Sequence, residues 1–349
     1  MAEIFKAFTF EEDGTSGDIV ENLRQTVSSG MWSGGSTTLT SFYTSSTQSG
    51  SSGDYFYDVY KTDPATDSNA EVQFSVAYGH DGGSGSKGGL GLSTGNRATA
   101  AVYNQFGNVM LGPTDDKFTF AGPYDSDDIY VLSFKRSRFR ERIDPGQWEL
   151  HVSGSGGTVK LIDNSSKADL SSVDIGGRVY DVVSGSISSG TAVINTAAAS
   201  QAGGGYGLFY PDMGAIILHP APLNASGSTG QLNLGTVSSS DTNNNNAGRM
   251  FNDIVRGVSF RARRQENISS THYFCRVHNR DFNFSNNPTF FTSSDGSLTQ
   301  QTFERDPKVY ISTVGLYNDT NELLAVAKLS KPILKSFARE AIVKVKLDF

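Results

Sequence analysis

Arginine recurs at every second position in one short stretch, which is the densest run of like charge in the chain. The residues are Arg136, Arg138, Arg140 and Arg142. If the apolar run Ile129–Phe134 continues through them as a strand, all four guanidiniums project from one face at intervals of about 6.6–6.8 Å. Guanidinium suits bidentate pairing with carboxylates, so the row predicts a docking edge for another protein. The alternatives are a solvated edge strand whose like charges block aggregation, and a nucleic-acid contact, for which no aromatic stacking platform accompanies the row.

Metal-ligating residue types occur close together once, at His272, Cys275 and His278. Zinc needs three or four ligands that converge on one point. In a strand, positions 272 and 278 share one face and position 275 points to the other, so these side chains diverge. We therefore expect a strand with Cys275 in the core and no metal.

Three carboxylates, Asp125, Asp127 and Asp128, are spaced somewhat like a calcium loop. An EF-hand loop needs Gly at its sixth position and Glu at its twelfth, and both are missing, so we expect a solvated turn. The Gly-rich segment around Lys87 lacks phosphate-loop spacing, because Ser86 precedes the lysine and Gly88 follows it. The sequence thus predicts a protein without a catalytic site or cofactor.

Composition indicates what kind of elements must position these residues. The chain has 349 residues with 38 Gly, 22 Phe, 14 Tyr and 2 Trp, and it is rich in Ser, Thr and Asn. Such a composition is typical of strands joined by turns. The formal charge of −7 argues against a general nucleic-acid or anionic-membrane binder. A single cysteine excludes a disulfide framework, and we expect no signal peptide and no membrane-spanning segment.

Alternating apolar residues predict strands along most of the chain, and helical spacing is rare. The fold class expected is mainly β, with β-sandwich or open-barrel domains, two or three short helices and long Gly/Ser/Asn loops. Helices are predicted at Asp18–Val27, at Asn96–Met110 and around Met250–Val258. The predicted strands are Tyr55–Tyr60, Glu71–Tyr78, Ile129–Phe134, Gln147–Val152, Thr158–Ile162, Arg178–Val183, the hairpin Tyr206–Tyr210 with Ala215–Leu218, and His272–His278.

Three regions are expected from changes in composition. Residues 1–65 are predicted to be an N-terminal helix and flexible assembly arm, 66–235 a central β-rich domain, and 236–349 a C-terminal β-rich domain. The tract Ser28–Gly53 is almost entirely Ser, Thr and Gly, with isolated aromatics at Trp32, Phe42 and Tyr43. Isolated aromatics in a polar tract need a partner surface, so we expect them to anchor a neighbouring subunit; a plain flexible linker is the alternative.

The most regular pattern lies at the end of the chain. Val309–Tyr317 and Glu322–Lys328 predict a hairpin, with pairing broken at Lys331-Pro332. Both hairpin strands are apolar on both faces, which predicts a position between two layers. The final strand, Glu340–Phe349, has aliphatics on one face and mainly charges on the other, so we expect it to be half exposed.

Five segments resemble virion structural proteins of contractile-tailed bacteriophages, notably those of marine and cyanobacterial hosts. They are Asn283–Phe290, Tyr310–Asp319, Glu322–Pro332, Tyr206–Asp212 and Glu71–His80. The terminal hairpin is also similar to one in phage tail-fibre attachment modules. The resemblance extends from about Tyr55 to the end and carries no catalytic residues.

The resemblance implies a non-enzymatic component of the virion tail, most specifically of the baseplate, made in the host cytoplasm and present in several copies beside other tail or baseplate proteins. A receptor- or glycan-binding tail-fibre protein is the alternative, and a glycan hydrolase with two facing carboxylates is a further one. A binder should expose aromatics and Asn or Asp on its loops. An assembly subunit should bury its aromatics between chains.

Overall fold

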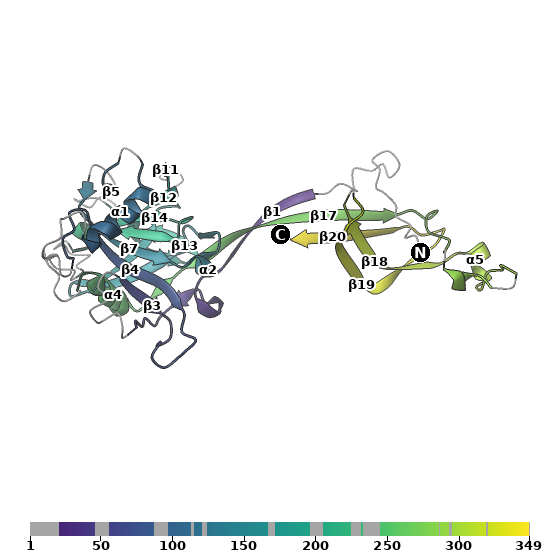
Figure 1. Cartoon of the computed structure of the whole chain (residues 1–349), viewed down its shortest axis with the longest axis horizontal. Helices are drawn as coiled ribbons and strands as arrows, with labels where there is room; N and C mark the ends of the chain where they lie inside the picture. Colours follow the sequence, from purple (N-terminus) through teal and green to yellow (C-terminus); the bar gives the residue numbers. More distant parts are fainter. Residues whose placement is uncertain are drawn as a thin grey trace. The chain divides into compact units, whose positions relative to one another are not determined.

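The computed structural model describes residues 21–45, 56–86, 97–112, 115–120, 124–166, 172–195, 205–224, 232, 245–285, 287–292, 295–318 and 320–348. Antiparallel strands dominate these residues, which confirms the mainly β fold class. The described α-helices are all short: α1 (Ala98–Met110), α2 (Arg136–Phe139), α3 (Pro220–Asn224), α4 (Asn245–Gly257) and α5 (Thr302–Arg305). The helices predicted before Met110 and around Met250 are confirmed as α1 and α4 (Figure 1).

The chain divides into two compact units with bounds that differ from those expected. Unit 1 combines the N-terminal part up to Gln25 with Asn267–Phe349, and unit 2 is Thr26–Glu266. The polar tract before α4 indicated a boundary near residue 235, but α4 and β16 (Phe260–Arg261) pack into the sheet of unit 2. Composition shows where the loops are. The contacts of the segments that follow a loop decide which unit those segments join.

Unit 2 is built on one large, curled antiparallel sheet. Its strand order is β2 (Thr38–Leu39), β16, β9 (Glu149–Gly154), β10 (Gly157–Asp163), β12 (Gly177–Ser188), β14 (Gly207–Tyr210), β15 (Ala215–Leu218), β7 (Asp128–Phe134), β4 (Val72–His80) and β3 (Phe56–Tyr60). The short strands β11 (Ser172–Asp174) and β13 (Thr191–Ile194) pair with β12. Helix α4 packs on β9 near one end of this order and on β4 and β3 at the other. The sheet therefore curls around α4 as an open barrel.

Aromatic side chains fill the inside of the curl. The ring of Trp32 lies 6.0 Å from Phe74 of β4 and 5.0 Å from Phe260 of β16, so it bridges strands that are distant in the sheet order. Its indole nitrogen donates a 3.0 Å hydrogen bond to the carbonyl of Phe260. Tyr57 of β3 stacks on Phe251 of α4 at 5.6 Å. These contacts hold the two ends of the sheet together.

The central strands are buried on both faces. In β7, Tyr130 and Leu132 belong to the inner core, while Ile129 and Val131 belong to a second core on the other face. Helix α1 packs on β4 and contributes Tyr103 to that second core. The small hairpin of β5 (Phe118–Phe120) and β6 (Tyr124–Ser126) adds two phenylalanines of its own to it. The sheet thus has a layer on each side.

The predicted N-terminal helix is wrong. Residues 21–30 form strand β1 (Glu21–Gly30), and the preceding part of the prediction, residues 18–20, lies outside the described residues. In the smaller sheet, β1 lies next to β17 (Arg263–Val277), which also pairs with β8 (Arg142–Ile143) and β20 (Ala341–Asp348). Apolar spacing suited to a helix was overridden by pairing with a strand more than two hundred residues away in the sequence.

Unit 1 is a small two-layer β structure. Strands β17 and β20 pair from Ser270↔Asp348 to Val277↔Ala341. Their inner face carries Cys275, Val343 and Val345, and the hairpin of β18 (Val309–Tyr317) and β19 (Leu323–Lys335) packs against it (Figure 1). The hairpin side chains in this contact are Val314, Leu316, Ala327, Leu329 and Ile333. The half-exposed final strand and the core position of Cys275 are confirmed.

Two expectations for the hairpin are corrected. Only one of its faces is covered, and Tyr310, Leu324 and Val326 are exposed. Pairing also continues beyond Lys331-Pro332 to Lys335, because the ladder shifts register between Ile311 and Thr313. This irregularity accommodates the proline without ending the strand, so β19 is longer than predicted.

Candidate functional site

The arginine stretch does not form the predicted strand. Strand β7 ends at Phe134, and a single helical turn, α2, follows. Arg140 then has a left-handed backbone with φ 56°, and only Arg142 returns to a strand, β8, where it pairs with Gln265. The chain turns at this point because Phe139 is buried in the core of unit 2, which alternation along a strand would not allow. The row of four guanidiniums on one face is therefore wrong.

Three of the four arginines bind groups of their own chain. The Arg138 guanidinium forms an ion pair with Glu71, and Arg140 Nη1 lies 2.8 Å from Glu266 Oε2. Arg136 donates to the carbonyl of Asp212 at 3.0 Å. The hydrogen bond and positive charge of Arg138 lower the pKa of the Glu71 carboxyl. These contacts fix the α2 turn, and a docking role for the four arginines stays a prediction.

Two of the three aromatic residues of the N-terminal tract belong to the core of unit 2. Trp32 is 1% exposed and Phe42 is also buried, in the same cluster as Leu39. The partner surface that these rings need is in the same chain, which corrects their predicted role as anchors for a neighbour. Tyr43 is exposed and its backbone pairs with Tyr60, so its role stays a prediction. Residues 46–53 of the predicted arm lie outside the described residues.

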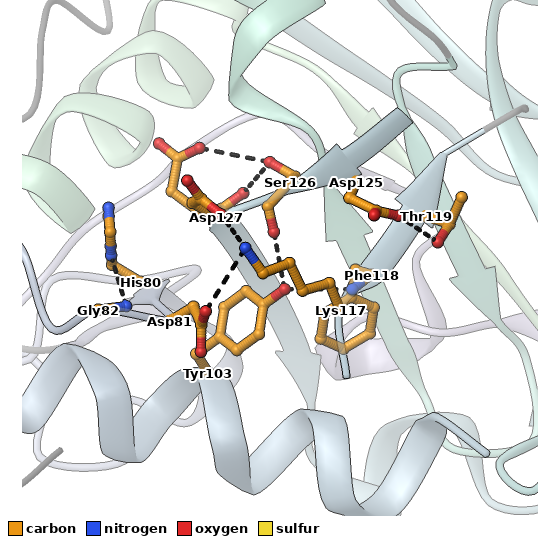
Figure 2. Close-up of polar contacts among 11 residues, drawn as sticks. His80, Asp81, Gly82, Tyr103, Lys117, Phe118, Thr119, Asp125, Ser126 and Asp127 are labelled. Carbon is orange, nitrogen blue, oxygen red and sulfur yellow. Dashed lines mark hydrogen bonds and ion pairs between the residues drawn. The ribbon is translucent and has the colours of Figure 1, made fainter. Parts of the chain in front are cut away.

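The polar cluster at the end of β4 contains the aspartates that were spaced like a calcium loop. Figure 2 shows Lys117 between two of its carboxylates: Nζ lies 2.5 Å from Asp127 Oδ1 and 3.7 Å from Asp81 Oδ2. Asp125 accepts a 2.9 Å hydrogen bond from the Thr119 hydroxyl. The aspartates thus point to separate partners and do not converge on a common centre.

Tyr103 ties this cluster to helix α1. Its hydroxyl donates to the carbonyl of Ser126 at 2.7 Å and accepts from the amide of Phe118 at 3.1 Å (Figure 2). Burial raises the pKa of Tyr103 to about 12. A phenol that is neutral at all physiological pH values, with both hydrogen-bonding functions occupied, holds the β5–β6 hairpin on α1. This is a structural role.

The pKa values of the two neighbouring aspartates of the cluster, Asp127 and Asp128, shift in opposite directions. The hydrogen bond and charge of Lys117 lower the pKa of Asp127, and Asp127 raises the pKa of Lys117. Burial raises the pKa of Asp128, whose carboxyl accepts from the Tyr78 hydroxyl at 3.3 Å. A buried carboxyl with a raised pKa can take part in proton transfer, but the hydrogen-bond partners of this one are the hydroxyls of Tyr78 on β4 and Ser126 on β6.

Two further results concern metals and membranes. In the described part of the chain, no three histidine, cysteine, aspartate or glutamate side chains come close enough together to hold a metal ion. His278 lies 3.4 Å from Glu340, on the strand pair whose other face buries Cys275.

Among the described helices, none combines the length and the apolar character needed to cross a bilayer.

An exposed apolar surface lies on the uncovered side of the β18–β19 hairpin. We call it the hairpin patch and define it as Tyr317, Leu323, Leu324 and Val326. A Cβ atom at Gly315 would meet the Tyr317 ring at 2.9 Å and Leu323 at 3.4 Å, so these two side chains close over the glycine. Val326 pairs directly with Gly315. Leu324 is 67% exposed and Val326 57%.

Sequence reasoning missed a second surface of unit 1, an aromatic hollow in the segment between β17 and β18. The hollow measures about 540 Å³. Its aromatic walls are Phe282, Phe284, Phe290, Phe303 and Tyr310, and its other lining residues are Ser285, Thr289, Thr299, Gln300, Lys308 and Val309. The signal was available as phenylalanines recurring in a segment otherwise rich in Asn, Ser and Thr.

Comparison of the chain with protein-family models, with curated proteins and with solved structures finds no match.

Proposed function

We propose that this chain is a non-enzymatic structural component of a bacteriophage virion, positioned in the baseplate of a contractile tail and acting through protein–protein assembly interfaces. The observation that carries the proposal is the hairpin patch. The hairpin is apolar on both faces, yet unit 1 covers only the face that packs on β17 and β20. Contiguous exposed apolar surface marks an interaction site.

A neighbouring tail subunit is the occupant we propose for the patch. Fully burying a Leu or Val side chain stabilises an interface by roughly 1.5–3 kcal/mol, so a partner over the four side chains would supply the missing layer of the sandwich. Lys328, which pairs with Thr313 farther along the hairpin, is exposed beside this surface. A charge at the margin of an apolar centre is typical of protein interfaces.

A variant pair tests the interface. Val326→Lys should leave the chain folded, because the side chain is largely exposed, but should reduce the copies per purified virion at least about tenfold, since a desolvated ammonium opposes docking. Val193→Lys is the matched control, an exposed valine on β13 of unit 2. Quantitative immunoblots of purified particles measure both. Normal incorporation of Val326→Lys would show that the hairpin patch is not the interface.

Immunogold labelling of intact virions tests the function itself. Label at the baseplate is expected. Label at the fibre tips would instead favour the alternative, a receptor- or glycan-binding tail-fibre protein, for which the aromatic hollow is the favouring observation. Absence of the chain from virions would overturn both proposals.

A further inference from the structure

The aromatic hollow of unit 1 is formed by a segment that carries a cluster of aromatic rings. Phe290 lies at the centre of that cluster: its ring is 5.7 Å from Phe284, 5.1 Å from Phe291 and 5.2 Å from Phe303, each in an edge-to-face arrangement. Such packing holds the rings in fixed orientations. Phe284 is nevertheless 61% exposed, so one of the walls presents ring surface to solvent.

A buried lysine fixes another wall. Lys335 is fully buried at the end of β19, and its ammonium donates to the carbonyl of Asp281 and, at 2.7 Å, to Asn283 Oδ1. These acceptors flank Phe282, whose backbone is left-handed with φ 52°. A bulky residue adopts this conformation only where its surroundings impose it. The backbone at Phe282 is thereby fixed beside the hollow that its side chain lines.

Polar groups are available beside the rings. Gln300, whose side chain is exposed, and Ser285 line the same space. A second hollow of about 500 Å³ shares Gln300, Phe303 and Lys308 with the first. It adds the polar side chains of Gln301, Thr302, Arg305 and Asp306. The two hollows adjoin at these shared residues; the first is lined by more aromatic residues and the second by more residues with polar side chains.

We propose that these adjoining hollows of unit 1 bind a carbohydrate, a pyranose against the phenylalanine rings and the next sugar unit against the polar side chains of α5. The C–H bonds on one face of a pyranose carry partial positive charge and match the negative face of an aromatic ring. Its hydroxyls are paired donors and acceptors, which amide, hydroxyl, guanidinium and carboxylate groups match. A volume near 500 Å³ per hollow lies within the range of small-molecule sites. This binding activity goes beyond the proposed assembly role and does not depend on it.

The test is binding of the full chain to an array of bacterial surface oligosaccharides, followed by calorimetric titration with the best ligand on the array. The parent chain is expected to bind at least one oligosaccharide saturably. Phe284→Ala and Gln300→Ala should each weaken binding about tenfold, the first through lost stacking and the second through a lost hydrogen-bond partner. Phe337→Ala, which removes an exposed ring of unit 1 that does not line the hollows, should leave the affinity unchanged.

An empty array would overturn the proposal. Binding that survives both Phe284→Ala and Gln300→Ala would also overturn it, because the sugar would then be held elsewhere. If the array is empty and Phe284→Ala reduces incorporation into virions, the hollow is a contact between proteins, which contradicts the carbohydrate site while supporting the assembly role. Circular dichroism of each variant confirms that unit 1 is still folded.

Discussion

At the scale of single residues, the buried carboxyl of Asp253 on α4 is expected to make the stability of unit 2 depend on pH. One of its oxygens pairs with Arg256 at 3.0 Å, while Oδ2 has no hydrogen-bond partner among the described residues. Burial raises the pKa of Asp253 to about 6. The folded state therefore holds a proton that the unfolded chain, with an Asp pKa of about 3.9, has released.

The direction of the pH dependence of stability follows from this difference between the folded and unfolded pKa values. The stability that the protonated carboxyl provides is present in full below about pH 4 and is lost as pH rises through about 6. Asp253→Asn should then match the parent near pH 4 and be more stable at pH 7, by up to about 3 kcal/mol. Burial also raises the pKa values of Asp163 and Asp181, so the readout is the difference between variant and parent in urea midpoints. An equal difference at both pH values would contradict the assignment.

At the scale of elements, strand β20 offers two neighbouring side chains with opposite environments. Val343 is 6% exposed and packs with Cys275, whereas Ile342 is 63% exposed on the other face. Val343→Ala should destabilise unit 1 by about 2 kcal/mol, and Ile342→Ala by less than about 0.5 kcal/mol. Hydrogen exchange of the β17 amides measures both. Similar effects of the two changes would mean that β20 does not pack by one face.

At the scale of the whole molecule, the two units can be followed by different signals. The sequence has two tryptophans, Trp32 and Trp148, and both are buried in unit 2. Tryptophan fluorescence therefore reports on unit 2, while circular dichroism reports on both units. Val343→Ala should shift a transition seen by circular dichroism and leave the fluorescence transition in place, because separate cores need not unfold as one. Coincident shifts by both probes would show that the units unfold together.

Alternation by itself determined most of the strands of this protein, because a strand with one covered face must alternate. The half-exposed β20 and the core position of Cys275 were predictable from it. The hairpin of β14 and β15, which is buried throughout, was predictable from the turn at residues 211–214. Where the charge pattern or the apolar spacing was compatible with more than one kind of element, long-range contacts decided which element formed. The apolar residues spaced as in a helix near the N-terminus form a strand through pairing with β17, and the arginines leave the strand because Phe139 must reach the core.

The candidate surfaces were decided only by the tertiary structure. The sequence shows that the terminal hairpin is apolar on both faces, but whether a second layer covers it depends on how many elements fold against it, and unit 1 supplies one layer. The aromatic hollow likewise depends on Lys335, far along the chain, holding the residues on both sides of Phe282. Local pattern determines which face of an element is apolar, and only the packing of distant segments determines which of those faces remains open to a partner.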